Sequence, residues 1–206
     1  MPSIKFRAVA LSGLLFAAGG VVVASSPAGA QGNGVCNGKD VTIVTEPGVP
    51  TNGTDGDDVI IGTQGDDVIN GRLGNDTICG LGGKDEIRGA AGADWINGGG
   101  AGDKIWGGDG HDILFGGDGW DRMFGGSGKD TMDGGGGNDT MRGNGWADTM
   151  LGSAGNDYVH GGLADDSING GFGDDELRGS NGTNTCSDPD LEVVAYGGCQ
   201  IRNFDE

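Results

Sequence analysis

Residues 107–115 read GGDGHDILF, and the next two stretches, GGDGWDRMF (116–124) and GGSGKDTMD (125–133), repeat the pattern with a period of nine. Each stretch has glycine at its first, second and fourth places, aspartate at its sixth place and, at its eighth place, an apolar residue. Glycine loses more backbone entropy on folding than any other residue. A strict period with one apolar place in every unit therefore indicates an ordered repeat rather than a disordered glycine-rich chain.

The frame extends from Gly53 to Ser187 as fifteen units without an insertion. The first place is glycine in every unit, the eighth place is aliphatic from Ile60 to Leu177, and Cys186 takes the eighth place of the last unit. The fourth-place glycine is replaced in three units, by Ala101, Trp146 and Ala164. Glycine permits positive φ and tight turns. We therefore interpret each unit as a six-residue turn and a three-residue strand whose eighth-place residue points inward.

Two such units close one coil, so successive strands lie on opposite sides of a flattened tube and each side forms a parallel sheet. The pattern predicts an all-β solenoid, a parallel β-roll, with coils about 4.8 Å apart. Its core is thin, because only one side chain in each unit is expected to face inward. Apolar burial in such a core does not offset the backbone entropy lost on ordering the repeats. A further stabilising interaction is required.

The sixth place is aspartate in every unit but the last, which has Asn184. Units n and n+2 stack directly, so these aspartates form two files with neighbours about 4.8 Å apart. Like charges at this spacing repel each other, and a cation between two rungs turns the repulsion into attraction. One file is Asp58, Asp76, Asp94, Asp112, Asp130, Asp148 and Asp166, and the other is Asp67, Asp85, Asp103, Asp121, Asp139, Asp157 and Asp175.

Calcium suits these files better than magnesium does. Ca²⁺ takes 6–8 oxygen ligands in a tolerant arrangement and accepts backbone carbonyls, whereas Mg²⁺ needs a stricter octahedron. The rungs of the two files allow up to about twelve Ca²⁺ ions at one ion per neighbouring pair. The net charge of −19 also favours cations as partners and disfavours nucleic acid, whose binding proteins need basic surfaces.

The units resemble the RTX, or hemolysin-type, calcium-binding nonapeptide repeat G-G-x-G-x-D-x-U-x, which residues 107–115 match at every defined place. The resemblance covers residues 53–187. It implies a right-handed parallel β-roll that folds on binding several Ca²⁺ ions, with the sixth-place aspartates and turn carbonyls as ligands. Four early units lack the second glycine, which leaves their turn geometry open; they carry Thr54, Thr63, Arg72 and Leu81.

Residues 1–30 have the order of a secretory signal peptide. Lys5 and Arg7 precede an apolar run over residues 8–24, and Ala-Gly-Ala follows at residues 28–30. The run is too short and too rich in glycine for a membrane span, which needs roughly 20 apolar residues. We therefore expect a secreted, extracellular protein whose mature chain has no membrane span.

The segments that flank the repeats, residues 31–52 and 188–206, contain strand-like runs and are predicted to form N- and C-terminal caps, which a solenoid needs. An even number of cysteines in an exported chain favours disulfides over zinc, and no pair has C-x-x-C spacing. Four cysteines allow 3 pairings. We favour a bond in each flank, Cys36 with Cys79 and Cys186 with Cys199.

The function that fits these features is a calcium-binding protein with a structural, adhesive or surface-interaction role. An alternative is a non-catalytic fragment or accessory of an extracellular RTX enzyme or toxin system. We expect no enzyme activity, because H-E-x-x-H and G-x-S-x-G motifs are absent from the sequence and neither histidine has a nucleophile in phase. The outward aromatics Trp106, Phe115 and Phe124 allow two interpretations: lateral packing, or a contact patch for a cell surface, a polysaccharide or another copy of the chain.

Overall fold

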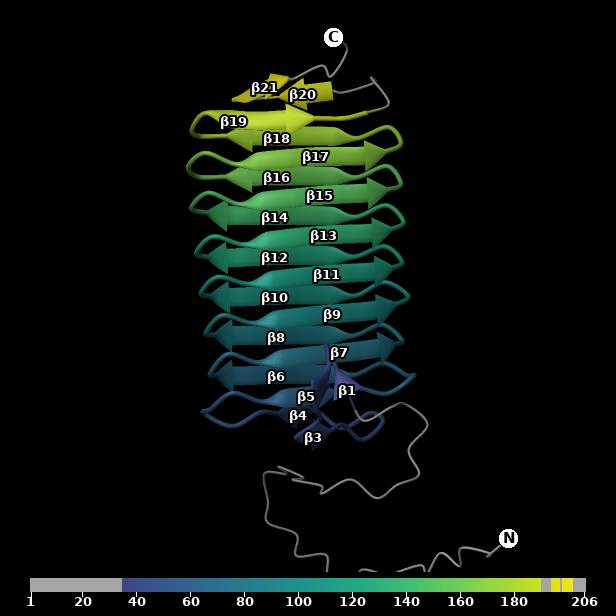
Figure 1. Cartoon of the computed structure of the whole chain (residues 1–206). Helices are drawn as coiled ribbons and strands as arrows, with labels where there is room; N and C mark the ends of the chain where they lie inside the picture. Colours follow the sequence, from purple (N-terminus) through teal and green to yellow (C-terminus); the bar gives the residue numbers. More distant parts are fainter. Residues whose placement is uncertain (1–34, 190–193, 197, 202–206) are drawn as a thin grey trace, which may run out of the picture.

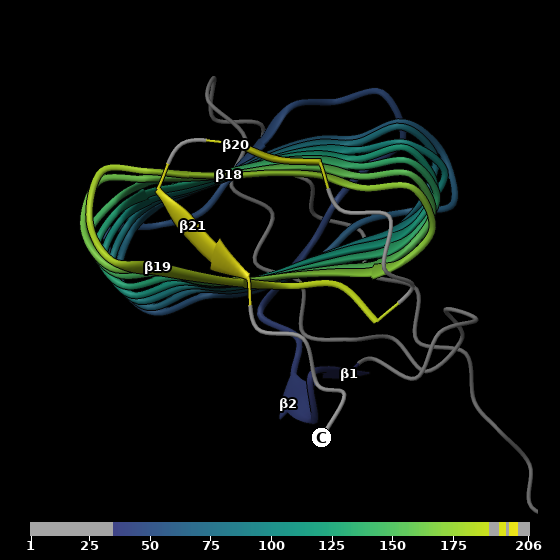
Figure 2. The ribbon, with the colours of Figure 1, turned by 90° about the horizontal axis from the view of Figure 1, so that it is seen from above.

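The strands begin at the seventh place of a nonapeptide and run into the next one. The computed structural model describes residues 35–189, 194–196 and 198–201, and these residues contain strands and turns but no helix. Successive strands alternate between two parallel sheets that face each other across a flat core (Figure 1, Figure 2). The chain is therefore a right-handed parallel β-roll, with the hand that crossovers between parallel strands nearly always take. The predicted fold class is confirmed.

The odd sheet contains the odd-numbered strands from β3 to β21 in sequence order, each paired in parallel with the next. Its strands are β3 (Ile43–Val44), β5 (Val59–Ile61), β7 (Thr77–Gly82), β9 (Trp95–Gly100), β11 (Ile113–Asp118), β13 (Thr131–Gly136), β15 (Thr149–Ala154), β17 (Ser167–Phe172), β19 (Asn184–Ser187) and β21 (Cys199–Ile201). The strands of the even sheet are β4 (Thr51–Asn52), β6 (Val68–Leu73), β8 (Glu86–Ala91), β10 (Lys104–Asp109), β12 (Arg122–Ser127), β14 (Thr140–Gly145), β16 (Tyr158–Gly162), β18 (Glu176–Ser180) and β20 (Val194–Tyr196).

The expected three-residue strand was too short. β10 covers six residues, and its pairing with β12 continues to Asp109 opposite Ser127. The first-place glycine lies inside the strand, because the inward alternation continues through it: Asp103, Ile105 and Gly107 are all buried. Three places in each unit therefore face inward, rather than one.

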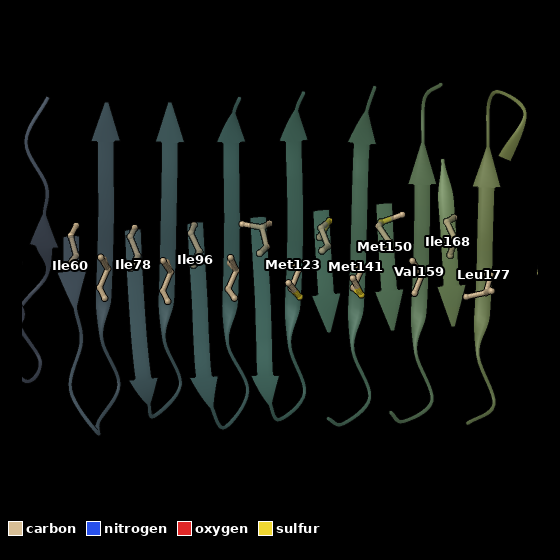
Figure 3. Close-up of a cluster of buried hydrophobic side chains, with 14 of the residues drawn as sticks. Ile60, Ile78, Ile96, Met123, Met141, Met150, Val159, Ile168 and Leu177 are labelled. Carbon is tan, nitrogen blue, oxygen red and sulfur yellow. The ribbon is translucent and has the colours of Figure 1, made fainter. Parts of the chain in front are cut away.

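The apolar core is a double file of eighth-place side chains between the two sheets (Figure 3). The side chains from Ile60 to Cys186 are at most 1% exposed, and Ile43 of β3 extends the core by one residue at its N-terminal end. Each aliphatic side chain stacks on its equivalent one coil away, as Ile105 does on Met123 in the register of β10 and β12. The inward position predicted for the eighth place is confirmed.

Both ends of the solenoid are tied to the repeats by disulfides. β1 (Val35–Cys36) and β2 (Lys39–Asp40) form an antiparallel hairpin whose Cys36 is bonded to Cys79 of β7. The hairpin therefore lies against the outer face of the odd sheet (Figure 2). Cys186 of β19 is bonded to Cys199 of β21. The predicted signal peptide, residues 1–30, lies outside the described residues, as do parts of both predicted caps.

Candidate metal site

The sixth-place aspartates lie where the turns enter the strands, and the coil spacing stacks them. From Asp58 to Asp166, each backbone N–H donates to Oδ1 of the sixth-place residue one coil later, at 2.7–3.0 Å. The structure therefore brings all fourteen predicted aspartates into two files. One carboxylate oxygen of each rung is already used by this amide.

The second carboxylate oxygen, Oδ2, is buried without a hydrogen-bond partner in eleven consecutive sixth-place aspartates. These side chains are at most 3% exposed. We call them the core aspartates: Asp76, Asp85, Asp94, Asp103, Asp112, Asp121, Asp130, Asp139, Asp148, Asp157 and Asp166. A buried carboxylate oxygen with no partner costs free energy unless a cation or a proton compensates it.

The first-place glycine makes room for this oxygen. A Cβ on Gly107 would lie 2.3 Å from Oδ2 of Asp112 and 2.7 Å from the carbonyl oxygen of Gly125, one coil later. An aspartate oxygen and a backbone carbonyl therefore border the same small space, and any side chain at place one would fill it. Space, rather than backbone conformation, is therefore the reason for the strict first-place glycine, because none of these glycines has a positive φ.

The donor set of each turn is made of oxygen, which fits calcium. In the part of the chain that the structure describes, no group of three or more His, Cys, Asp or Glu side chains could hold a metal. An ion in these turns would therefore need backbone carbonyls beside one or two carboxylates, and Ca²⁺ accepts such a mixed set. Softer metals that prefer nitrogen or sulfur ligands do not fit.

Burial shifts the titration of the core aspartates. It raises their pKa above the ordinary 3.8, to about 6 for Asp76 and about 7 for Asp112. The amide bonded to Oδ1 opposes the shift, and neighbouring aspartates add to it. Loss of solvation is the largest cause in each case, so these carboxylates are poorly compensated as anions.

The first two turns of the solenoid are closed by threonine. The N–H and Oγ1 of Thr54 donate to Oδ2 of Asp58 at 2.6 and 2.9 Å, and Thr63 does the same for Asp67 at 2.6 and 3.0 Å. Oδ2 of each of these two carboxylates therefore accepts two hydrogen bonds. The sequence signal for this contact is the threonine four residues before the aspartate, which we did not recognise from the sequence as a hydrogen-bond donor to Oδ2.

The turns in which threonine binds Oδ2 (closed turns) differ from the others (open turns) in the backbone φ of the second-place residue. In later units, non-glycine residues at this place have positive φ, as Arg72 (φ 87°) and Leu81 (φ 81°) do. Thr54 and Thr63 do not, because a β-branched side chain disfavours positive φ strongly. The turn geometry left open by the sequence is thus kept at Arg72 and Leu81 and changed at the two threonines.

The last unit ends the carboxylate files. Oδ1 of Asn184 accepts the N–H of Asp166 at 2.8 Å, so the asparagine keeps the rung. Its Nδ2 takes the position beside the first-place glycine, 2.4 Å from where a Cβ of Gly179 would be. An amide nitrogen there is a donor and cannot bind a cation.

The outward aromatics pack along the sheets. Trp106 stacks on Phe124 with ring centroids 5.8 Å apart, and Phe115 contacts Trp95 at 5.5 Å. Lateral packing on the sheet therefore accounts for these side chains. Their rings contact neighbours one coil away.

Comparison with known families gives one result. The profile of the RTX calcium-binding nonapeptide repeat matches residues 52–87, 80–114, 115–150, 143–177 and 151–186. A comparison with curated proteins found no match. Among the described residues, no helix has the length and apolar character needed to cross a membrane.

Proposed function

This chain belongs to the family of RTX calcium-binding nonapeptide repeats, and on that premise we propose that it is a secreted calcium-binding protein whose central coils fold around several Ca²⁺ ions. The family and the solenoid together indicate a calcium-binding structural role. The proposal adds secretion, the binding of multiple ions and a role at an extracellular surface. It assigns no enzyme activity.

The observation that carries the proposal is the row of eleven unpartnered Oδ2 atoms. The core aspartates would hold the ions together with turn carbonyls, and Ca²⁺ would supply the positive charge that these buried oxygens lack. Asp175 is the last aspartate of the file that contains Asp157, and its Oδ1 accepts the N–H of Asp157 at 2.8 Å. Asp58 and Asp67 are left out of the proposed ligand set, because threonine already donates two hydrogen bonds to Oδ2 of each.

The positions of the closed and open turns indicate that the ends of the solenoid and its central coils differ in their need for calcium. At its N-terminal end, the Thr54 and Thr63 turns and the disulfide of Cys36 form a segment that needs no ion. At its C-terminal end, Asn184 keeps the rung through Oδ1 and has an amide nitrogen where the aspartates have Oδ2, so this rung needs no ion either. The coils between them depend on calcium, so the two ends act as templates on which the central coils order.

Two disulfides support the proposed extracellular location, because such bonds persist in oxidising compartments. Export into a calcium-rich medium would then couple secretion to folding. Before export, a chain without calcium keeps its buried carboxylates uncompensated and stays largely unfolded.

The test is calcium titration of residues 31–206 prepared with both disulfides formed. Circular dichroism should show a gain of β-structure, small-angle scattering a fall in the radius of gyration, and native mass spectrometry several bound Ca²⁺ ions. Mg²⁺ at the same concentration is the control and should produce little change. A chain that is equally compact after complete removal of metal would contradict the proposal.

A further inference from the structure

The two outer faces of the solenoid differ in charge. Seventh- and ninth-place side chains point outward, and in strands β5 to β19 of the odd sheet these places carry no lysine or arginine. The same places of the even sheet, from β6 to β18, carry five of the 12 basic residues of a chain whose net charge is −19. These residues are Arg88, Lys104, Arg122, Arg142 and Arg178.

Two of the five basic side chains are already paired. Arg88 and Arg178 form ion pairs with Glu86 and Glu176 of their own strands. Arg88 also lies over the ring of Trp106, 4.7 Å from its centroid, and Trp106 stacks on Phe124. The aromatic rings are thus occupied by neighbours along the file. The ring of Trp106 therefore has a neighbour on both sides along the file.

The other three form a compact group, which we call the basic cluster: Lys104 of β10, Arg122 of β12 and Arg142 of β14. Lys104 lies directly beside Arg122 in the strand register, and Arg142 is on the next strand. All three are exposed, and within the described residues none has an acidic partner at ion-pair distance. Glu86 lies beside Lys104 in the register of β8 and β10, but its ion pair is with Arg88. Like charges directly opposite each other, such as Lys104 and Arg122, destabilise a sheet.

The positive charge of this face affects the titration of a neighbouring histidine. Burial, and then the positive charges of Arg142 and Arg178, lower the pKa of His160 on β16. The histidine is therefore neutral and adds no charge to the face. At its seventh and ninth places this face carries five basic residues against two acidic ones, Glu86 and Glu176, in a strongly acidic protein.

From the charge complementarity of this face we propose that the basic cluster is a docking site for an extended anionic polysaccharide, one that carries carboxylate or sulfate groups. Lys104 and Arg122 are directly opposite on strands about 4.8 Å apart, and Arg142 lies diagonally across on the next strand, opposite Phe124. A linear chain that crosses the strands with repeated negative groups could contact all three. The acidic edges of the solenoid repel a densely charged polyanion at long range, which favours a polysaccharide with sparser negative groups over a nucleic acid. The hairpin of β1 and β2 contacts the odd sheet, so among the described residues it leaves this face open (Figure 2).

This inference rests on the proposed surface role of the folded solenoid, so the test begins by verifying the fold. The protein loaded with Ca²⁺ is first checked by circular dichroism, and a sample that is not folded tests the calcium proposal only. Folded protein is then assayed for binding to immobilised heparin, to polygalacturonate and to neutral dextran. We expect binding to at least one of the two polyanions, weakening with added NaCl, and none to dextran.

A matched pair of variants distinguishes the cluster from general electrostatics. Lys104→Gln with Arg122→Gln removes two charges from the cluster, and Lys84→Gln with Lys129→Gln removes two from exposed turn positions. The first pair should reduce affinity by about ten-fold or more and the second by less than about two-fold. Equal losses in the two variants would overturn the proposal, as would folded protein that binds neither polyanion, prefers a single-stranded DNA oligonucleotide, or instead self-associates through this face.

Discussion

The backbone N–H of Asp112 donates a 2.9 Å hydrogen bond to Oδ1 of Asp130, one coil farther along the solenoid. The contact explains how two carboxylates with an unfavourable charge can stack. Each rung binds the next through an amide, and only one oxygen per side chain is left for a cation. The backbone amides therefore compensate part of the charge repulsion expected from the sequence. A cation or a proton at Oδ2 must compensate the rest.

Replacing one core aspartate should stabilise the protein without calcium and destabilise it with calcium, relative to the natural chain. Asp112→Asn keeps the rung, as Asn184 shows, and removes a buried charge. Without calcium the variant should show more β-structure by circular dichroism than the natural chain, and with calcium it should melt at a lower temperature. Native mass spectrometry should count at least one Ca²⁺ ion fewer.

Asp109→Asn is the control for that variant, because Asp109 is the exposed third-place residue of the same unit. It removes the same formal charge. Its β-structure without calcium and its melting temperature with calcium should change little, and its ion count should not change. A similar loss of ions in both variants would mean that net charge, rather than the buried Oδ2, governs binding.

A closed turn should open when its threonine is removed. Thr63→Gly deletes the hydroxyl that binds Oδ2 of Asp67 and permits the positive φ of the later turns. We expect one additional Ca²⁺ ion in native mass spectrometry. Thr63→Val also lacks the hydroxyl but retains β-branching, so it should gain no ion and lose about 1 kcal/mol of stability.

The metal-free protein should be more stable in acid than at neutral pH. A core aspartate whose pKa is raised from 3.8 to about 6 or 7 binds its proton more tightly in the folded than in the unfolded state. The stability from this protonation is fully present below pH 3.8 and is lost as the pH rises through 6 to 7. Circular dichroism of the demetallated protein should therefore show more β-structure near pH 4 than near pH 8.

Saturating calcium should invert that pH dependence. Protons and Ca²⁺ compete for the same carboxylates, so acid should release the ions and lower the melting temperature of the loaded protein. A metal-free protein whose stability increased from pH 4 to pH 8 would contradict the assignment of these aspartates as poorly compensated buried anions.

The first-place glycine should tolerate no side chain. Gly107→Ala places a Cβ against Oδ2 of Asp112 and the carbonyl of Gly125, at 2.3 and 2.7 Å. We expect a loss of about 2–4 kcal/mol in the free energy of unfolding with calcium present. Gly136→Ala is the matched control, because its nearest neighbour would be Oδ1 of Asp118 at 3.5 Å, and chemical denaturation should show a much smaller loss.

By itself, the sequence determined the period, the two-unit coil and the inward eighth place. These follow from local chemistry, because a regular spacing of glycine and one apolar residue admits few backbone paths. Even the unequal charge of the two faces is present in the sequence, since alternate units supply alternate sheets. The stacking of Asp112 on Asp130 also followed from the period.

Only the tertiary structure decided what each carboxylate oxygen meets. Asp67 and Asp76 occupy the same place in the repeat, yet the Oδ2 of Asp67 is bound by Thr63 while that of Asp76 has no partner. The difference depends on the φ adopted at the second place and on the distance to the coil above. The full length of the strands was also decided there, because pairing between coils extends the strand through the first-place glycine into residues that the repeat pattern alone assigned to the turn.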